Sequence, residues 1–393
     1  MTAEEIRKTL QREFVRTIRK PFMDAVKEYD MVRPGDRVAV CISGGKDSML
    51  LGLLLRDLQH TVDFELKFLA MDPGYAPEGR RHLEENARKL DIPLEIFDTD
   101  VLRVAGSHSA EHPCFLCAKM RRGYLYAEAK KRGCKVMMYG CGIGPINRAA
   151  NRRMAAKTID ASVDRITLRD DNSRALLSEM GVVHPDICVS ADPTIILTPA
   201  PHEIVNLALE KCGIDPDGSY IGFGLRNWKG LDDALPEIAA AADYAYEKHG
   251  LTPVFVPIEF PSDLMPAERV GALLHCPRHA VRIRQPIETT IGILARMKTV
   301  VGIRLHSLMF SAGQGVPVVG MSYDIKVDGF LKYIGSRTCL QLSSVRADEL
   351  CRLIDECVSG ALDSEVHRTA EMLRDREQEN VKGAAALLRL SGD

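Results

Sequence analysis

The spacing of apolar and polar positions predicts two runs in which strands alternate with helices. In the first run, strands are expected at 37–42, 64–72, 93–100 and 135–140, separated by helices at 48–59, 78–91 and 117–132. In the second run, strands are expected at 219–226, 252–259, 280–285, 300–305 and 317–323, with helices at 231–249, 264–276, 288–297 and 306–314. Regular alternation of this kind is typical of parallel sheets covered by helices. We therefore expect an α/β protein of two doubly wound domains with a cleft between them.

The remaining segments set the expected domain limits. Apolar residues recur about every fourth position over 3–30, which predicts one or two amphipathic helices interrupted near Pro21. Five prolines fall within 185–217, and a charged segment at 363–391 predicts a long closing helix. The expected organisation is an N-terminal helical segment at 1–34, a first α/β domain at 35–184, a linker at 185–217, a second α/β domain at 218–362 and a C-terminal helix at 363–393.

Composition narrows the class of protein. The 393 residues are 46% hydrophobic and 27% charged, values ordinary for globular proteins. No apolar run approaches the roughly 18–20 residues of a membrane span, and the N-terminus lacks an apolar signal core. We expect a cytoplasmic protein whose eleven cysteines are mostly reduced. The net charge of −2 gives no overall attraction for nucleic acid, although a local basic patch would.

A glycine-rich hexapeptide, SGGKDS, stands between the strand 37–42 and the helix that follows. Its glycines allow backbone N–H groups to approach phosphate closely, and the positive end of the helix favours an anion. The spacing differs from the GxxxxGK[ST] pattern of other phosphate loops. The alternative is a tight strand–helix turn capped by serine. We expect ATP to bind at Ser43, Gly44, Gly45, Lys46, Asp47 and Ser48.

SGGKDS resembles the signature of the PP-loop ATP pyrophosphatases, a HUP-like α/β fold. MDPGY at 71–75 and PCFLCAKMRRGYLYAEAKKRGC at 113–134 extend the resemblance to the tRNA 2-thiocytidine synthetase family, over roughly 10–138. The resemblance implies ATP with Mg²⁺, an iron–sulfur cluster held in part by Cys114 and Cys117, and a basic face toward tRNA at Lys119, Arg121 and Arg122. The alternatives are two thiols on one helical turn and a solvated helix face. The family's second cysteine pair is absent, so we expect no complete iron–sulfur site.

Charged side chains follow several predicted strands of the second half. Arg304 and His306 stand at the end of the strand 300–305, and Lys326 follows the next strand. Arg148 follows a strand and a glycine-rich turn of the first domain. Ligands of open α/β sheets bind at such strand ends, where Arg304 can pair with a carboxylate and His306 can transfer a proton. Each of these residues has a purely structural alternative. His306 can be a polar residue at a helix start, Arg304 an ion-pair partner, and Lys326 a solvated cation.

From about residue 137 onward the chain resembles the polysaccharide pyruvyl transferases. The blocks that carry this resemblance are YGCGIGPINRAANRR, LRDDNSRALLSEMGV, SADPTIIL, GFGLRNWKG and VGIRLHSLMFSAGQGVPVVGMSYDIKVDGF. It implies a GT-B-like pair of domains, phosphoenolpyruvate as donor, and a cell-wall polysaccharide or lipid-linked precursor carrying N-acetylmannosamine as acceptor. His306 would be the general acid, and Arg148, Arg304 and Lys326 would hold the anion, with no metal or redox cofactor.

Two hypotheses about function follow, with a first domain that is a hybrid of the two families. The first is pyruvyl transfer from phosphoenolpyruvate to a polysaccharide, because all the proposed catalytic residues are present. The alternative is ATP-dependent tRNA 2-thiolation by the PP-loop half. A weaker third hypothesis is an anion-binding scaffold without turnover. Whether two families are joined here by natural fusion or by recombination, the sequence leaves open.

Overall fold

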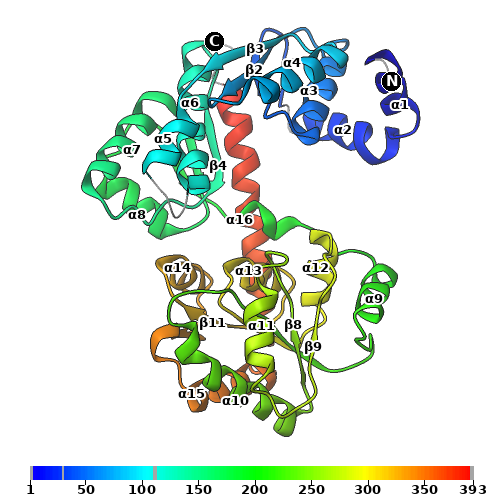
Figure 1. Ribbon diagram of the computed structural model, residues 1–393, viewed down its shortest axis with the longest axis vertical. Coiled ribbons are helices and arrows are strands. Elements are labelled where there is room, and N and C mark those ends of the chain that lie inside the picture. The colour runs from blue at the N-terminus through cyan, green and yellow to red at the C-terminus, as the bar shows by residue number, and fades with distance from the viewer. Residues whose placement is uncertain (1–2, 29–30, 109–112, 390–393) are drawn as a thin grey trace.

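The computed structural model describes residues 3–28, 31–108 and 113–389. It consists of two α/β bodies, and the long helix α16 (Asp363–Arg389) runs from one to the other (Figure 1). Every strand pairing in both bodies is parallel, as the alternation of strands and helices predicts. The expected α/β fold class is thus confirmed.

The N-terminal body contains two three-stranded sheets. The first has the order β1 (Arg37–Cys41), β2 (Glu65–Asp72), β3 (Leu94–Asp98), and the second the order β4 (Met137–Cys141), β5 (Arg165–Leu168), β6 (Asp186–Val189). Their near edges approach each other, since a Cβ on Gly133, just before β4, would lie 3.3 Å from the Arg37 guanidinium of β1. Taken edge to edge, the strands run 3-2-1-4-5-6, an order typical of doubly wound nucleotide-binding folds.

Helices surround these two sheets. They are α1 (Ala3–Arg12), α2 (Lys20–Glu28), α3 (Lys46–Leu58), α4 (Pro77–Lys89), α5 (Val101–His108), α6 (Pro113–Lys131), α7 (Ala149–Ser162) and α8 (Asp171–Glu179), with a π-helical turn at Val15–Arg19. The break in the N-terminal helices precedes Pro21, which occupies the first turn of α2. Proline is tolerated there because N–H groups of a first turn have no partner within the helix.

The C-terminal body is built on one six-stranded sheet of order β12-β11-β10-β7-β8-β9. Its strands are β7 (Tyr220–Gly224), β8 (Thr252–Phe255), β9 (His279–Ala280), β10 (Thr299–Gly302), β11 (Val318–Ser322) and β12 (Cys339–Gln341). Its helices are α10 (Leu231–His249), α11 (Leu264–Gly271), α12 (Ile287–Leu294), α13 (Leu305–Gly313), α14 (Ile325–Tyr333) and α15 (Ala347–Val358). Val300 and Val318 belong to one buried cluster, and Val301 and Val319 to the other. Successive side chains of a strand face opposite ways, so both faces of this sheet are core.

Two expected elements are shorter than the sequence indicates. The strand expected at 280–285 is reduced to β9, and α11 ends at Gly271 instead of 276. The Asp243 carboxylate accepts hydrogen bonds from the backbone N–H groups of His275 (3.0 Å) and Cys276 (2.9 Å). Those N–H groups therefore do not continue the helix.

The segment 185–217, expected as a linker, contains regular structure. Residues 186–189 form β6 in the second N-terminal sheet, and α9 (His202–Lys211) packs into the core of the C-terminal body through Val205, Ala208 and Leu209. The chain therefore crosses between the two bodies within a much shorter stretch, which includes the 3-10 turn Pro193–Ile196.

Helix α16 fastens the crossing segment to both bodies. Its Asn380 is fully buried; its side-chain amide donates to the Ala191 carbonyl (2.9 Å) and accepts from the Ser190 hydroxyl (2.6 Å). Nearer the C-terminal body, Arg374 donates to the Gly313 carbonyl (2.8 Å). The Tyr333 hydroxyl of α14 also donates to the Ser190 carbonyl. These bonds hold the carboxyl end of β6 against the C-terminal body.

Candidate active site

The turn after β10 is shaped by glycines that admit a serine. A Cβ on Gly224 would lie 2.2 Å from the Ser307 hydroxyl oxygen, and one on Gly302 would lie 2.7 Å from it. That hydroxyl donates to the Arg304 carbonyl at 2.6 Å, and the Arg304 N–H donates to the Gly224 carbonyl at 3.0 Å. Helix α13 can therefore begin directly at the sheet edge, which places Arg304 and His306 at the carboxyl ends of β7 and β10.

His306 is half-buried at this edge, with its ring 5.8 Å from that of Phe310. Burial lowers its pKa below the ordinary value. The nearby cations Arg169, Arg304 and Lys326 lower the pKa further, while Asp192 opposes them. The lowered pKa favours the neutral form of the His306 imidazole, which can accept a proton.

Arg304 is engaged by carboxylates of its own domain. Its Nε lies 2.9 Å from Asp263 Oδ2 and its Nη2 lies 2.6 Å from Glu259 Oε2. Asp263 is buried and also accepts hydrogen bonds from the N–H groups of Ile258 and Glu259. Arg304 therefore forms ion pairs, as the structural alternative from the sequence expected. The same ion pairs fix its guanidinium near His306.

The N-terminal body contributes two charged residues that the sequence interpretation did not select. Arg169 follows β5, and its Nη1 lies 3.0 Å from Oδ2 of the buried Asp192, which follows β6. The Arg169 guanidinium packs against Gly142, where a Cβ would lie 2.6 Å from its Nε. Both residues stand in the blocks LRDDNSRALLSEMGV and SADPTIIL, directly after apolar strands, which was the available signal.

Lys326 and Arg148 are both exposed, but they differ in their relation to His306. Lys326 lies in the first turn of α14, close enough to lower the pKa of His306. Arg148 precedes α7, and its carbonyl accepts the Arg152 N–H at 3.0 Å. Within the described part of the chain, no interaction joins the Arg148 side chain to His306. The structure thus gathers three of the four predicted residues, together with Arg169 and Asp192.

The SGGKDS loop lies at the carboxyl end of β1 and opens α3. Gly44 has φ +87°, a left-handed conformation that glycine adopts without strain, and Gly45 precedes the first helical residue. The Ser48 hydroxyl donates to the Gly45 carbonyl (2.9 Å) and accepts from the Ser43 N–H (3.2 Å). Lys46 is 92% exposed beside Asp47. The loop thus presents to solvent a helix N-terminus and an exposed ammonium group, whose Nζ lies 3.1 Å from Asp47 Oδ1.

The paired cysteines lie in the first turns of α6. The side chains of Cys114 and Lys119 fall outside the described residues, Cys117 and Arg121 are half-buried, and Arg122 is exposed. Among the side chains that the structure describes, which exclude that of Cys114, no group of three or more His, Cys, Asp or Glu is arranged to hold a metal ion.

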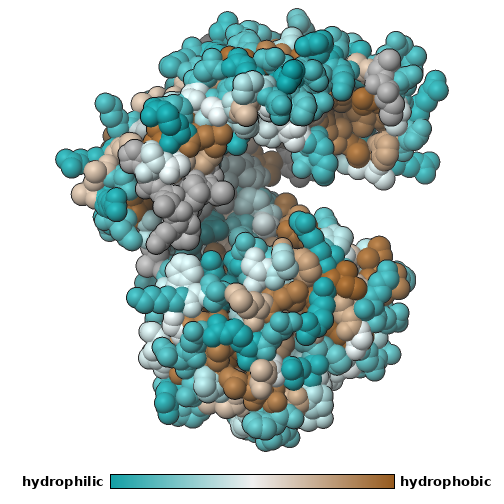
Figure 2. Space-filling view, in the orientation of Figure 1, coloured by the Kyte–Doolittle hydropathy of each residue, from teal (hydrophilic) through white to brown (hydrophobic). Residues whose placement is uncertain are grey.

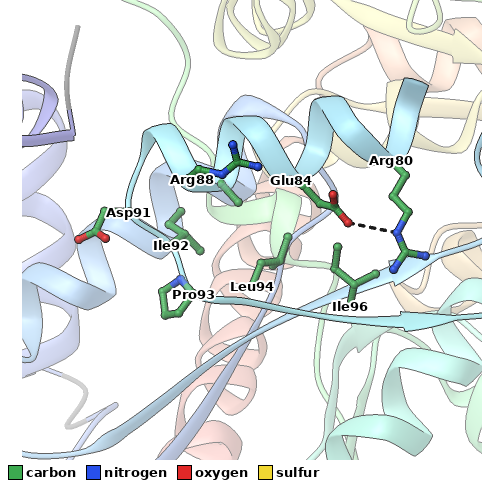
Figure 3. A pocket seen from close by; sticks show the side chains of 9 residues that line it. Arg80, Glu84, Arg88, Asp91, Ile92, Pro93, Leu94 and Ile96 are labelled. Atoms are coloured by element: carbon green, nitrogen blue, oxygen red, sulfur yellow. Dashed lines mark hydrogen bonds and ion pairs between the residues drawn. The ribbon is translucent and has the colours of Figure 1, made fainter. Parts of the chain in front are cut away.

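Surface cavities lie elsewhere in the described part of the chain. One of about 570 Å³ is open between α4 and β3, lined by Arg88, Leu94 and Ile96 and by the ion pair Arg80–Glu84 (Figure 3). Another, of about 290 Å³, lies beside Pro317 near the start of α16. Neither is lined by His306. A hollow also separates the two bodies (Figure 2).

Known proteins resemble this chain in three ways. The family model "Polysaccharide pyruvyl transferase" matches residues 53–325, a range that includes Arg148, Arg169, Arg304 and His306 and ends beside Lys326. The match begins well before residue 137, so it also covers much of the PP-loop-like half, although the SGGKDS loop precedes it.

Among the described residues, none of the helices has both the length and the apolar character that a membrane span requires.

Curated relatives resemble only part of the chain. The tRNA-cytidine(32) 2-sulfurtransferase of Neisseria meningitidis serogroup C is 37% identical over 126 residues, which is 30% of this chain and 38% of that protein. The enzyme of the same name from Alkalilimnicola ehrlichii is 40% identical over 126 residues, with the same coverage. The chain therefore spans well under half the length of these relatives.

Solved structures resemble almost the whole chain in fold. HepE from Anabaena, bound to UDP-glucose, has a TM-score of 0.53 at 12% identity and covers 90% of this chain and 99% of its own. MnaA from S. aureus, bound to UDP, has a TM-score of 0.50 at 10% identity, covering 90% and 94%. These likenesses establish a GT-B fold. With a family model matching more than two thirds of its residues, the chain belongs to the polysaccharide pyruvyl transferase family.

Proposed function

We propose that this protein transfers the pyruvyl group of phosphoenolpyruvate to two hydroxyls of a polysaccharide sugar, forming a ketal and releasing phosphate. The observation that carries the proposal is the cluster at the domain junction. There a neutral histidine is surrounded by Arg169, Arg304 and Lys326, within the range that matches the family. Phosphoenolpyruvate carries a carboxylate and a phosphate, the groups that such cations bind.

The cations have separate roles in this proposal. Lys326 and Arg169 lie near His306 and would neutralise the phosphate as it leaves. Arg304, fixed by Glu259 and Asp263, would present its remaining edge to the carboxylate. Arg148 is exposed and would reach the donor from the N-terminal body.

The proposed chemistry begins with a neutral imidazole. His306 takes up the proton of a sugar hydroxyl and delivers it to the C3 methylene. Positive charge then develops at C2, and the oxygen of that hydroxyl bonds to C2. A second hydroxyl attacks C2 as the C2–O–phosphate bond breaks, and its proton leaves with phosphate. One donor and one diol thus give one ketal and one phosphate, and the step as written balances without oxidant or reductant.

The test is phosphate release from phosphoenolpyruvate by the full chain in the presence of an acceptor that contains N-acetylmannosamine. Acceptor-dependent release, with a pyruvyl ketal on the acceptor by mass spectrometry, is the expected result. The acceptor is proposed to be a cell-wall polysaccharide or its lipid-linked precursor, used in the cytoplasm. A protein that neither binds phosphoenolpyruvate in calorimetry nor releases phosphate from it would remove the proposal.

A second function, ATP binding at residues 43–48, is supported by two observations. Gly44 has a left-handed backbone just before the 13-residue helix α3. The two sulfurtransferases named above are 37% and 40% identical to this chain over 126 residues. If ATP binding served tRNA 2-thiolation instead, Cys114 and Cys117 would have to hold an iron–sulfur cluster. Stoichiometric iron and sulfide after anaerobic reconstitution, lost in Cys114→Ser, would favour that alternative.

A further inference from the structure

Three side chains form an aromatic and cationic cluster at the carboxyl edge of the C-terminal sheet. Trp228 follows β7 and Tyr323 follows β11, and their rings lie 4.5 Å apart. The Arg226 guanidinium lies over both rings, at 4.8 Å from Trp228 and 5.2 Å from Tyr323. The indole nevertheless remains 43% exposed. It is the chain's only tryptophan.

Arg226 is fixed and incompletely satisfied. Its Nη1 donates to the Tyr323 hydroxyl at 2.5 Å, which with the stacking sets the plane of the guanidinium. Its Nε is buried and has no hydrogen-bond partner among the described residues. A buried unpaired donor costs free energy, so the Arg226 Nε calls for a functional explanation or a bound partner.

The cluster adjoins the candidate active site. Burial raises the pKa of Tyr323, and the charges of Arg226, Asp324 and Arg304 also act on it, so Tyr323 and Arg304 lie in the same region of the sheet edge. Arg304 in turn holds Glu259, whose side chain is 61% exposed. An open indole, a fixed guanidinium and an accessible carboxylate therefore share one strip of the sheet edge.

The charge of this strip separates two classes of ligand. Arg304 is paired with the carboxylates of Glu259 and Asp263, and the charges of Arg226 and Asp324 both act on Tyr323. This part of the strip therefore carries little net positive charge for a nucleotide's phosphates, whereas its planar donors and acceptors suit hydroxyl groups. Arg169 and Lys326, which lie near His306, remain for the phosphate of the donor. The apolar face of a sugar ring can pack on the open indole.

We propose that Trp228, Arg226 and Glu259 form a subsite for the acceptor sugar, with the ring packed on the indole and its hydroxyls bound by the guanidinium and the carboxylate. This inference rests on the proposed pyruvyl transfer, and it assigns the acceptor to the C-terminal domain. Trp228 is then a specificity-determining residue that does not touch the donor.

The single tryptophan allows a direct binding test without turnover. The full chain is titrated with the methyl glycoside of N-acetylmannosamine, with UDP and with phosphoenolpyruvate, while indole fluorescence is recorded. The glycoside is expected to change the emission saturably. A saturable change with UDP and none with the glycoside would overturn the proposal in favour of a nucleotide site.

Steady-state kinetics provide the second arm. Trp228→Ala is expected to raise the KM for the acceptor about tenfold, or ~1.4 kcal/mol, with the KM for phosphoenolpyruvate unchanged. Trp228→Phe should restore most of the affinity. Tyr246→Ala is the matched control, because this half-exposed aromatic ends α10 at the opposite edge of the sheet. Circular dichroism verifies folding of each variant.

The outcomes separate the two proposals. Fluorescence binding of the glycoside without phosphate release would support the subsite and reject the transferase function. The opposite outcome is phosphate release that depends on the acceptor, together with a folded Trp228→Ala variant whose KM for the acceptor is unchanged. That outcome would support the transferase and reject the subsite.

Discussion

At the scale of single residues, the chemistry depends on what surrounds His306. Burial and three cations lower its pKa, and the carboxylate of Asp192 limits that effect. The lowered pKa favours the neutral imidazole before substrate binds, and in the proposed reaction the proton that His306 transfers therefore comes from the acceptor. The binding of an anionic donor would offset the cations and favour the imidazolium that forms during the reaction.

The first prediction concerns this proton transfer. His306→Ala should lower the rate of phosphate release by roughly 10²–10⁴-fold, because the general base and acid is removed. Affinity for phosphoenolpyruvate should change little, since the cations remain. Stopped assays and calorimetry measure the two quantities, and equal rates for variant and wild type would exclude a catalytic role for His306.

The pH dependence follows from the same environment. Activity requires the neutral imidazole, so kcat/KM should be constant above the lowered pKa of His306 and fall as the pH drops through it. Lys326→Gln removes one of the cations that lower this pKa. The acid limb, and the pKa of His306 followed by NMR, should therefore both move to higher pH. A shift to lower pH would contradict the electrostatic interpretation.

Arg304 should prove important for stability as well as for the reaction. Arg304→Ala leaves the buried Asp263 carboxylate, 1% exposed, without its cation. The free energy of unfolding should fall by about 3–5 kcal/mol, and donor binding should be lost with it. Urea unfolding measures the change. Arg282→Ala breaks an exposed pair with Glu268 and should cost less than about 1 kcal/mol, which makes it the matched control.

At the scale of elements, the turns that begin α3 and α13 place chemistry at strand ends. Both follow a parallel strand directly, and both depend on glycine: Gly44 for its left-handed backbone, and Gly224 for the space that Ser307 fills. The first presents N–H groups to solvent, and the second places His306 beside the other domain. Similar strand–turn–helix units thus serve different purposes in the two bodies.

The loop before α3 gives the element-scale prediction. Gly45→Val should weaken ATP binding more than tenfold, about 1.4 kcal/mol, because the added side chain blocks the approach of phosphate. Folding should be preserved, since a Cβ at Gly45 meets only the Ser43 hydroxyl, at 3.5 Å. Calorimetry with ATP is the measurement. Gly106→Ala, at an open position of α5, is the control; equal affinity of wild type and Gly45→Val would reject the ATP site.

At the scale of the whole molecule, α16 connects the bodies whose junction contains the candidate site. The helix starts on the C-terminal body and ends on the sheet β4-β5-β6, where Asn380 binds the segment that precedes Asp192. The position of Arg169 and Asp192 relative to His306 therefore depends on a helix distant in the sequence.

Asn380→Ala tests this connection. It removes the amide that binds the Ala191 carbonyl and the Ser190 hydroxyl in a fully buried site, at a cost of about 1–3 kcal/mol. The Ser190 hydroxyl keeps its hydrogen bond to the Leu168 carbonyl, at 3.1 Å. We expect a lower thermal midpoint, and a looser domain arrangement in small-angle scattering. Glu379→Ala, next to it on the exposed face, should change neither. An unchanged midpoint in Asn380→Ala would show that other contacts hold the junction.

The sequence by itself determined the α/β class, the two bodies and the edge that holds His306, since strand–helix alternation and residues after strands are local patterns. The GT-B-like arrangement was implied by the resemblance to the pyruvyl transferases. Tertiary structure decided the partners. Arg304 meets Glu259 and Asp263, and Arg169 and Asp192 approach His306, only because segments distant in the chain converge at parallel strand ends. The expected linker at 185–217 differs for a related reason. β6 and α9 are stabilised by packing against the two bodies, and the prolines in this segment carry no information about such non-local contacts.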